Sequence, residues 1–187
     1  MIAKGHDFPN VTLSAVVMAD IGLSLPTYRA SERTFELIAQ AVGRSGRSAK
    51  VGEAMIQTFN PSHYAIVYGA RQDYEGFFKK EMQERKIAHY PPYVFLILVE
   101  FAAANEDKCV QAAYDFKEEF LATGIENFEV IGPLLPYYSM ANGKHKRMML
   151  LKFKNREEVY AYLKSLLGKY SSMGGVDISI NVDPLDY

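Results

Sequence analysis

The sequence has little cysteine and no long apolar run, and both absences restrict what the chain can be. A single cysteine, Cys109, excludes an internal disulfide and a zinc site built from several cysteines. No apolar stretch approaches the roughly 20 residues that a membrane-spanning helix needs, and no secretory signal is visible. We therefore expect a chain that acts in the cytoplasm and has no membrane partner.

Neither sign of charge is in excess. The 21 lysines and arginines are balanced by 22 aspartates and glutamates, which leaves a formal net charge of −1. This balance argues against an extended polyanion-binding surface, so any contact with nucleic acid should be a local patch. Hydrophobic residues make up 49% of the 187 residues, enough for one large or two small domains with cores of their own.

Two signatures of nucleotide chemistry are also absent. The chain has no G-x-x-x-x-G-K-[ST] phosphate loop and no acidic strand end of the Asp-Glu-x-His type. Without them it lacks the usual groups that bind Mg²⁺ and the phosphates of ATP. Asp183 and Asp186 have no histidine partner, so we predict no metal site near the last residues.

The most informative segment that is present is Gln-Ala-Val-Gly-Arg-Ser-Gly-Arg at residues 40–47. Gln40, Arg44 and Arg47 have the spacing i, i+4, i+7, so one stripe of a helix could present all three. A guanidinium is a planar, always-charged fork that suits phosphate oxygens and can stabilise a transferred phosphoryl group. The alternative is an ordinary helix end, with arginines that offset the helix dipole and Gly46 as the stop.

Residues 40–47 resemble motif VI of superfamily 2 helicases, Q-x-x-G-R-x-G-R, at every specified position. Residues 1–13 look like motif V of one helicase family, the bacterial primosomal replication-restart helicases. Residues 20–26 and 29–33 look like the linker between these two motifs in that family. The resemblance continues through three further segments, residues 90–92, 131–133 and 182–186.

The resemblance implies a parent that is an ATP-dependent DNA helicase acting in replication restart and primosome assembly, with ATP and Mg²⁺ as cofactors. Arg44 and Arg47 would reach the β- and γ-phosphates of ATP bound on a lobe that this chain lacks, and Gln40 would sense the γ-phosphate. A second group of residues would couple the nucleotide to the DNA strand. This coupling group consists of Lys4, Gly5, His6 and Asp7.

Because only motifs V and VI are found, we expect a C-terminal fragment of such a helicase. It would lack the zinc module of the family, bind no ATP and be inactive as an ATPase alone. The partners that the resemblance implies are forked or single-stranded DNA, the single-strand-binding protein and other primosome proteins. The parent would be a monomer, whereas open sheet edges would allow the fragment to self-associate.

The hydrophobic pattern predicts an α/β region followed by an α+β domain. Residues 1–70 would be the tail of a RecA-like parallel-sheet lobe, residues 71–90 a connecting helix, and residues 91–187 the C-terminal domain. In the first region we expect a buried strand at 12–18, then a helix that ends at Gly43 and Gly46. After a second strand, Asn60 should cap a helix that starts with Pro61, and Asp73 should cap the next helix.

In the last region, strands and helices are predicted in the order βαββαβ, which is that of a ferredoxin-like sandwich. Cys109 falls on the apolar stripe of the first of these helices, at residues 105–121, and is expected to be a buried, inert thiol. The strands are expected at residues 94–101, 128–131, 147–153 and 176–182, and the second helix at 156–168.

The stretch from residue 132 to residue 156 contains basic and aromatic residues and no acidic residue. Basic groups can follow a phosphate backbone, and aromatic rings can stack on bases. We therefore predict a DNA- or partner-binding patch, which could also dock the acidic tail of single-strand-binding protein. The alternatives are a solvated hairpin and a domain that only braces the motor lobe. The predicted residues are Tyr137, Tyr138, Lys144, His145, Lys146, Arg147 and Lys152.

Overall fold

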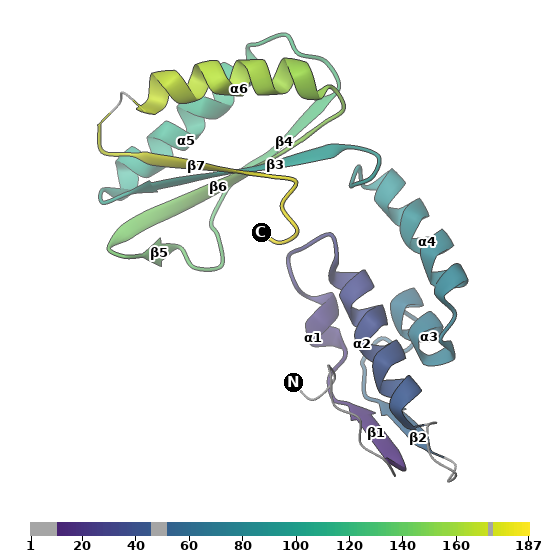
Figure 1. Cartoon of the computed structure of the whole chain (residues 1–187). Coiled ribbons are helices and arrows are strands. Elements are labelled where there is room, and N and C mark those ends of the chain that lie inside the picture. Colours follow the sequence, from purple (N-terminus) through teal and green to yellow (C-terminus); the bar gives the residue numbers. More distant parts are fainter. Residues whose placement is uncertain (1–10, 46–51, 172–173) are drawn as a thin grey trace. The chain divides into compact units, whose positions relative to one another are not determined.

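The computed structural model describes residues 11–45, 52–171 and 174–187, and the chain divides into two compact units. Unit 1 comprises the described residues up to Ile87 together with Asp186, and unit 2 comprises Ala88 to Leu185 with Tyr187. Unit 1 contains a two-stranded parallel sheet and unit 2 a five-stranded antiparallel sheet (Figure 1). The predicted mixture of helices with parallel and antiparallel strands is therefore confirmed. In the described part of the chain, no helix is long and apolar enough to cross a membrane.

Unit 1 is built around a strand–helix–strand crossover. Strands β1 and β2 pair in parallel, and a parallel pair needs such a crossover connection. Helices α2 and α3 pack closely, and Ile38 of α2 is fully buried with Val16 and Ile66 around it. The elements in chain order are β1 (Leu13–Val16), α1 (Asp20–Leu23), α2 (Ala30–Ser45), β2 (Glu53–Ile56), α3 (Tyr64–Arg71) and α4 (Tyr74–Ile87).

The prediction that residues 12–18 form a buried strand is wrong in its burial. Strand β1 has four residues, of which Val16 is buried while Leu13 is 55% exposed. Ser14 and Val16 share the face towards α2, since the Ser14 hydroxyl donates to the carbonyl of Ala41 (2.8 Å). Among the described residues, nothing covers the opposite face, which carries Leu13.

Helix α2 does not end at Gly43, as the sequence had indicated, but continues to Ser45. Gly43 instead makes room for the side chain of Gln72, because a Cβ at Gly43 would lie 2.9 Å from Gln72 Nε2. That nitrogen donates to the carbonyl of Ala39 (3.1 Å), so the glycine allows the end of α3 to approach α2. The other expected stop, Gly46, lies outside the described residues.

The start of α3 also differs from the prediction. Asn60 and Pro61 lie in a turn, and the helix begins three residues later at Tyr64 with His63 as its N-cap. Nδ1 of His63 accepts from the backbone N–H of Ala65 (3.2 Å), whereas the Asn60 side chain accepts from the Ser62 hydroxyl (3.1 Å). The predicted cap of α4 is confirmed, because Asp73 Oδ1 accepts from the N–H of Gly76 (2.9 Å).

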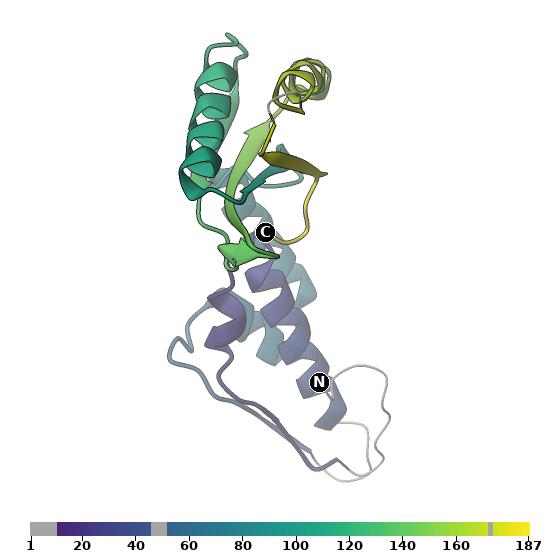
Figure 2. The ribbon, with the colours of Figure 1, turned by 90° about the vertical axis from the view of Figure 1, so that its left-hand side faces the viewer.

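Unit 2 is a sheet covered on one face by two helices (Figures 1 and 2). Its strands lie in the order β4-β6-β3-β7, with all pairs antiparallel, and the short β5 pairs with the start of β6. The elements follow one another in the predicted order βαββαβ, with β5 inserted. They are β3 (Phe95–Ala103), α5 (Glu106–Leu121), β4 (Phe128–Leu134), β5 (Met140–Ala141), β6 (Lys144–Phe153), α6 (Arg156–Ser171) and β7 (Asp177–Val182).

One continuous apolar cluster lies between the sheet and these helices. Alternate residues of β3 and β6 point into it, as the two-residue period of a strand requires. Phe116 of α5 lies edge-on to both Phe101 and Tyr170, with ring centroids 5.4 and 5.5 Å away. Asn105 caps α5 by accepting from the N–H of Lys108 (2.9 Å), so this helix starts where the sequence indicated.

Candidate functional site

The C-terminal half of α2 carries the predicted nucleotide-contacting residues that the structure describes. Gln40 is exposed and Arg44 is half-buried one turn later, in the last turn of the helix. Arg47 and the predicted coupling residues Lys4, Gly5, His6 and Asp7 lie outside the described residues. The structure therefore places two of these side chains one turn apart, at i and i+4.

Helix α2 is held on both sides near these residues. The bond from Ser14 to the Ala41 carbonyl fixes it to β1, and the bond from Gln72 to the Ala39 carbonyl fixes it to α3. Gly69 of α3 allows a still closer approach, since a Cβ there would lie 3.0 Å from the side chain of Ile38. The backbone around Gln40 is thus fixed by contacts to two other elements.

A buried ionic network that the sequence had not indicated joins α2, α3 and α4. Arg85 of α4 donates to Glu32 of α2 (2.6 Å) and to Glu81 of its own helix (2.7 Å). The hydroxyl of Tyr64 donates to the second oxygen of Glu81 (2.7 Å), and Arg29 pairs with Glu32 (2.5 Å). The i, i+3 spacing of Arg29 and Glu32, and the i, i+4 spacing of Glu81 and Arg85, are the only local signals of this network.

The contacts of this network shift the pKa values of Glu32 and Tyr64. Burial alone would raise the pKa of Glu32, but hydrogen bonds from Arg29 and Arg85 bring that pKa below its ordinary value. Burial, supported by the hydrogen bond to Glu81, raises the pKa of Tyr64 far above its ordinary value. Glu32 is therefore expected to be charged at neutral pH, with Tyr64 as a neutral donor.

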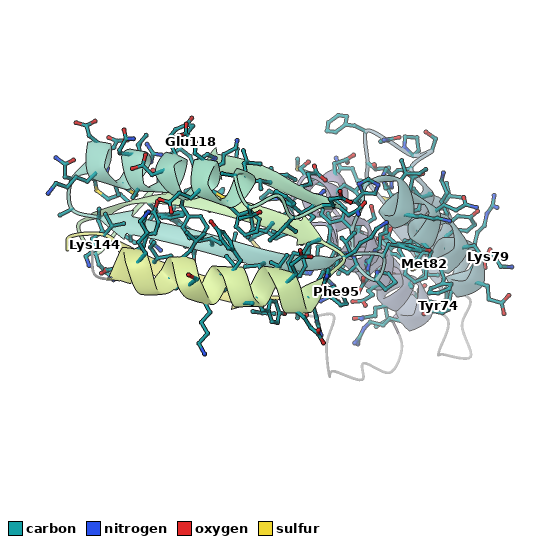
Figure 3. All side chains as sticks on the ribbon, turned by 90° about the horizontal axis from the view of Figure 1, so that it is seen from above. Tyr74, Lys79, Met82, Phe95, Glu118 and Lys144 are labelled. Atoms are coloured by element: carbon teal, nitrogen blue, oxygen red, sulfur yellow. The ribbon has the colours of Figure 1, made fainter. Side chains whose placement is uncertain are left out.

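In unit 2, the predicted basic patch is divided between the two faces of β6. His145 and Arg147 share the face of Met149 and Leu151, which lie in the apolar cluster beneath the helices. Lys144, Lys146 and Lys152 share the opposite face. Lys144 also lies near the end of the sheet opposite to Phe95 (Figure 3), and β6 pairs Phe153 with Phe95 at that other end.

Most cations of this stretch are already paired with carboxylates. Arg147 donates to Glu106 (2.7 Å), and this bond, with the nearby His145, lowers the pKa of Glu106. Lys144 pairs with Asp177, and Arg156 pairs with Asp183 (2.5 Å) while lying over the ring of Phe95. Among the described residues, no carboxylate pairs with Lys146 or Lys154. The local positive charge is consequently smaller than the sequence suggested.

Lys152 is a buried cation with structural contacts. Lys152 is only 5% exposed. Its ammonium donates to the carbonyl of Ala88 (3.0 Å) and lies 4.0 Å from the centre of the Tyr90 ring. Glu129 is 3.6 Å away across the strand pair. A small cleft of about 160 Å³ beside it is bordered also by Lys154 and Phe128. These contacts account for Lys152 without an external ligand.

Tyr137 and Tyr138 lie in the connection between β4 and β5, and both are strongly exposed. Their exposed fractions are 87% and 73%, and their rings meet edge to face with centroids 4.9 Å apart. Leu135 and Met140 beside them are also exposed, at 61% and 56%. This loop is an apolar and aromatic surface near Lys146, whose backbone N–H donates to the carbonyl of Ser139 (2.8 Å).

Cys109 is a buried thiol, as predicted. Its residue is 0% exposed, and the sulfur contacts the backbone carbonyls of Phe101 (3.5 Å) and His145 (3.3 Å). Burial raises the pKa of the Cys109 thiol, which disfavours the reactive thiolate. Among the described residues, no group of three histidine, cysteine, aspartate or glutamate side chains is placed to hold a metal ion.

Comparison with known proteins gives one consistent family. Residues 86–185 match the family model described as the primosomal protein N C-terminal domain. The replication restart protein PriA of Bacillus subtilis is 36% identical over 98% of this chain, and that of Treponema pallidum is 34% identical over all of it. The match covers 23% and 28% of those two proteins, so the chain spans about a quarter of the length of these relatives. The PriA of Chlamydia trachomatis is 48% identical over 57% of the chain and 14% of its own length.

Proposed function

The chain belongs to the family of the primosomal protein N C-terminal domain, and on that premise we propose that it is a working part of a replication-restart DNA helicase. In this proposal unit 1 is the tail of a RecA-like motor lobe, and its parallel β1–α2–β2 crossover supports that assignment. Unit 2 is a ferredoxin-like domain, which is supported by the strand order β4-β6-β3-β7.

The observation that carries the motor role is the position of Gln40 and Arg44. They lie one turn apart at the end of a helix that contacts to β1 and α3 hold in place. A guanidinium carried by a helix held in this way can stabilise the charge that develops on a transferred phosphoryl group. We propose that Arg44, with Arg47, acts on ATP and Mg²⁺ bound by another part of the intact protein, and that Gln40 senses the γ-phosphate.

The motor role is tested by replacing the matching segment of the Bacillus subtilis relative with this chain. Arg44→Ala in that chimera should lower DNA-stimulated kcat for ATP hydrolysis by on the order of 10³-fold. Arg71→Ala, which removes an exposed arginine from the last turn of α3, is the matched control and should leave kcat unchanged. Equal rates for the two variants would exclude the proposed role of Arg44. The 187-residue chain alone should show no ATP turnover, and measurable turnover would contradict the proposal.

A second role, contact with single-stranded DNA, is favoured by the exposed tyrosine pair of unit 2. Two rings at 87% and 73% exposure can stack on unpaired bases, and stacking contributes about 1–3 kcal/mol per base. Lys146 is the nearby candidate for a phosphate contact. Since Lys144 and Arg147 are paired with Asp177 and Glu106, we assign the DNA contact to Tyr137, Tyr138 and Lys146 first.

Fluorescence anisotropy of the chain with labelled single-stranded DNA tests this role. Tyr137→Ala with Tyr138→Ala should weaken binding, whereas Tyr114→Ala, a half-exposed tyrosine on α5, should not. Lys146→Gln should reduce the salt slope of log K by about 0.7, the value for one phosphate contact on a single strand. Binding of an acidic single-strand-binding-protein tail without DNA binding would identify a protein-docking module. Binding of neither ligand would leave unit 2 as a brace.

A further inference from the structure

Arg85 is the central residue of the ionic network in unit 1. Its guanidinium donates to the carboxylates of Glu32 (2.6 Å) and Glu81 (2.7 Å) and lies over the ring of Tyr28, whose centre is 5.0 Å away. The side chains are well shielded, with exposed fractions of 13% for Arg85 and 6% for Glu81. A planar fork with several donors can serve two carboxylates in this way, whereas an ammonium group acts as a single point charge.

The groups that Arg85 joins come from separate elements. Glu32 lies in the first turn of α2, and Glu81 lies on α4, where it also accepts from Tyr64 at the start of α3. Beside this network, Phe35 of α2 stacks on Phe77 of α4 with ring centroids 4.1 Å apart. Ring stacking restricts the distance between two helices. It restricts their relative rotation and sliding less, since flat rings can shift over one another. Directional bonds to Arg85 fix those remaining movements.

We propose that Arg85 is a positioning residue that makes α2 and α4 one rigid piece. The helix that carries Gln40 and Arg44 then keeps a fixed orientation relative to α4, and any movement of one is shared by the other. The part of this inference that concerns nucleotide response rests on the proposed motor function. The rigid connection itself does not, because it is argued from contacts between α2, α3 and α4 that involve no nucleotide.

The chain offers a matched control on the same helix. Lys80 and Glu84 form an exposed i, i+4 pair of nearly the same length (2.6 Å), with exposed fractions of 43% and 44%. Removing one partner of a buried pair leaves an uncompensated charge, whereas an exposed pair contributes little. Arg85→Met should therefore accelerate amide exchange in α4 by on the order of 100-fold, and Lys80→Met should leave it unchanged. Equal exchange in the two variants would overturn the proposal.

Positioning is separated from stability by a distance measurement on the 187-residue chain. Spin labels at Glu36→Cys on α2 and Lys79→Cys on α4 occupy exposed sites, and the buried Cys109 leaves these two as the labelled cysteines. Double electron–electron resonance should give one narrow distance distribution for the doubly labelled chain and for its Lys80→Met variant. The distribution should be broader for the Arg85→Met variant. If the distance distribution of Arg85→Met were as narrow as that of the doubly labelled chain without this substitution, Arg85 would only stabilise unit 1.

One further variant and one further measurement separate a loss of positioning from a failure to fold. Arg85→Lys retains the charge but not the fork, so it should broaden the distribution even where Arg85→Met fails to fold. Amide exchange of unit 2 reports in the same sample whether the rest of the chain is folded. No nucleotide takes part in these measurements, so their failure would leave the role of Arg44 untouched, and failure of the ATPase test would leave the rigid connection untouched.

Discussion

The two units are stabilised in different ways. Among the described residues, unit 2 gathers fifteen buried residues in one apolar cluster, whereas unit 1 divides seven between a cluster of four and a cluster of three. Unit 1 adds the buried network of Arg85, Glu32 and Glu81, and within the described ranges Leu13 on the outer face of β1 is exposed. The stability of unit 2 is therefore expected to come mainly from one continuous core, whereas unit 1 depends more on directional contacts between its helices.

The largest expected effect is in the core of unit 2. Phe116→Ala removes a ring that is 0% exposed and contacts Phe101 and Tyr170, so it should lower the free energy of unfolding by about 3–5 kcal/mol. Urea titration followed by circular dichroism measures the change, and amide exchange assigns it to unit 2. Faster exchange in unit 1 as well would contradict the separation of the two cores.

A smaller loss is expected from the equivalent change in unit 1. Ile38→Ala empties a fully buried site in the cluster of four and should cost about 3 kcal/mol. Because this cluster is small, the loss should open α2 and α3 together while exchange in unit 2 stays unchanged. A conserved exchange rate in α3 would show that the Arg85 network holds the helices without the apolar cluster.

The N-caps of α3 and α5 should make the stabilities of the two units respond differently to pH, because His63 titrates and Asn105 does not. Burial lowers the pKa of His63, so the unfolded chain binds a proton there more readily than the folded chain does. The contribution of His63 to stability is therefore full above its unfolded pKa of about 6.5 and is lost as the pH falls through the lower folded pKa. Thermal unfolding between pH 7.5 and 5 should show this loss in unit 1.

Two variants isolate the cap. His63→Asn keeps an acceptor at the N-cap without a titrating ring, so it should remove this part of the pH dependence. In unit 2, Asn105→Ala should cost about 1 kcal/mol at every pH in the range, because its cap has no titrating group. An unchanged pH profile in His63→Asn would mean that the loss comes from another group.

Local sequence signals were sufficient for most of unit 2. The range of α5 and the buried position of Cys109 on its apolar stripe were predicted correctly, since the helix period can be recognised within one short segment. The cap of α3 was not predicted, because a turn at Asn60 and Pro61 uses the same residue types as a helix start. The choice of His63 depends on where α3 packs on α2, which no local pattern specifies.

The ion pairs of the basic stretch show a second limit. Lys144, Arg147 and Arg156 pair with carboxylates 33, 41 and 27 residues away in the sequence. A run without acidic residues therefore looked unpaired, although the fold brings Asp177, Glu106 and Asp183 to it. The exposed Tyr137 and Tyr138 were identified from the same run, because a loop between strands leaves its aromatic residues uncovered.

The position of β3 in the sheet of unit 2 also bears on how this protein is made. This strand is the first of the unit to be synthesised, yet it pairs on one side with β6 and on the other with β7, the last, with Ile97 opposite Val182. During translation the edge of β3 that pairs with β7 therefore stays unpaired until β7 has left the ribosome, while the helices and strands of unit 1 are synthesised earlier. A nascent chain halted before β7 would expose that edge of β3 to pairing with other strands.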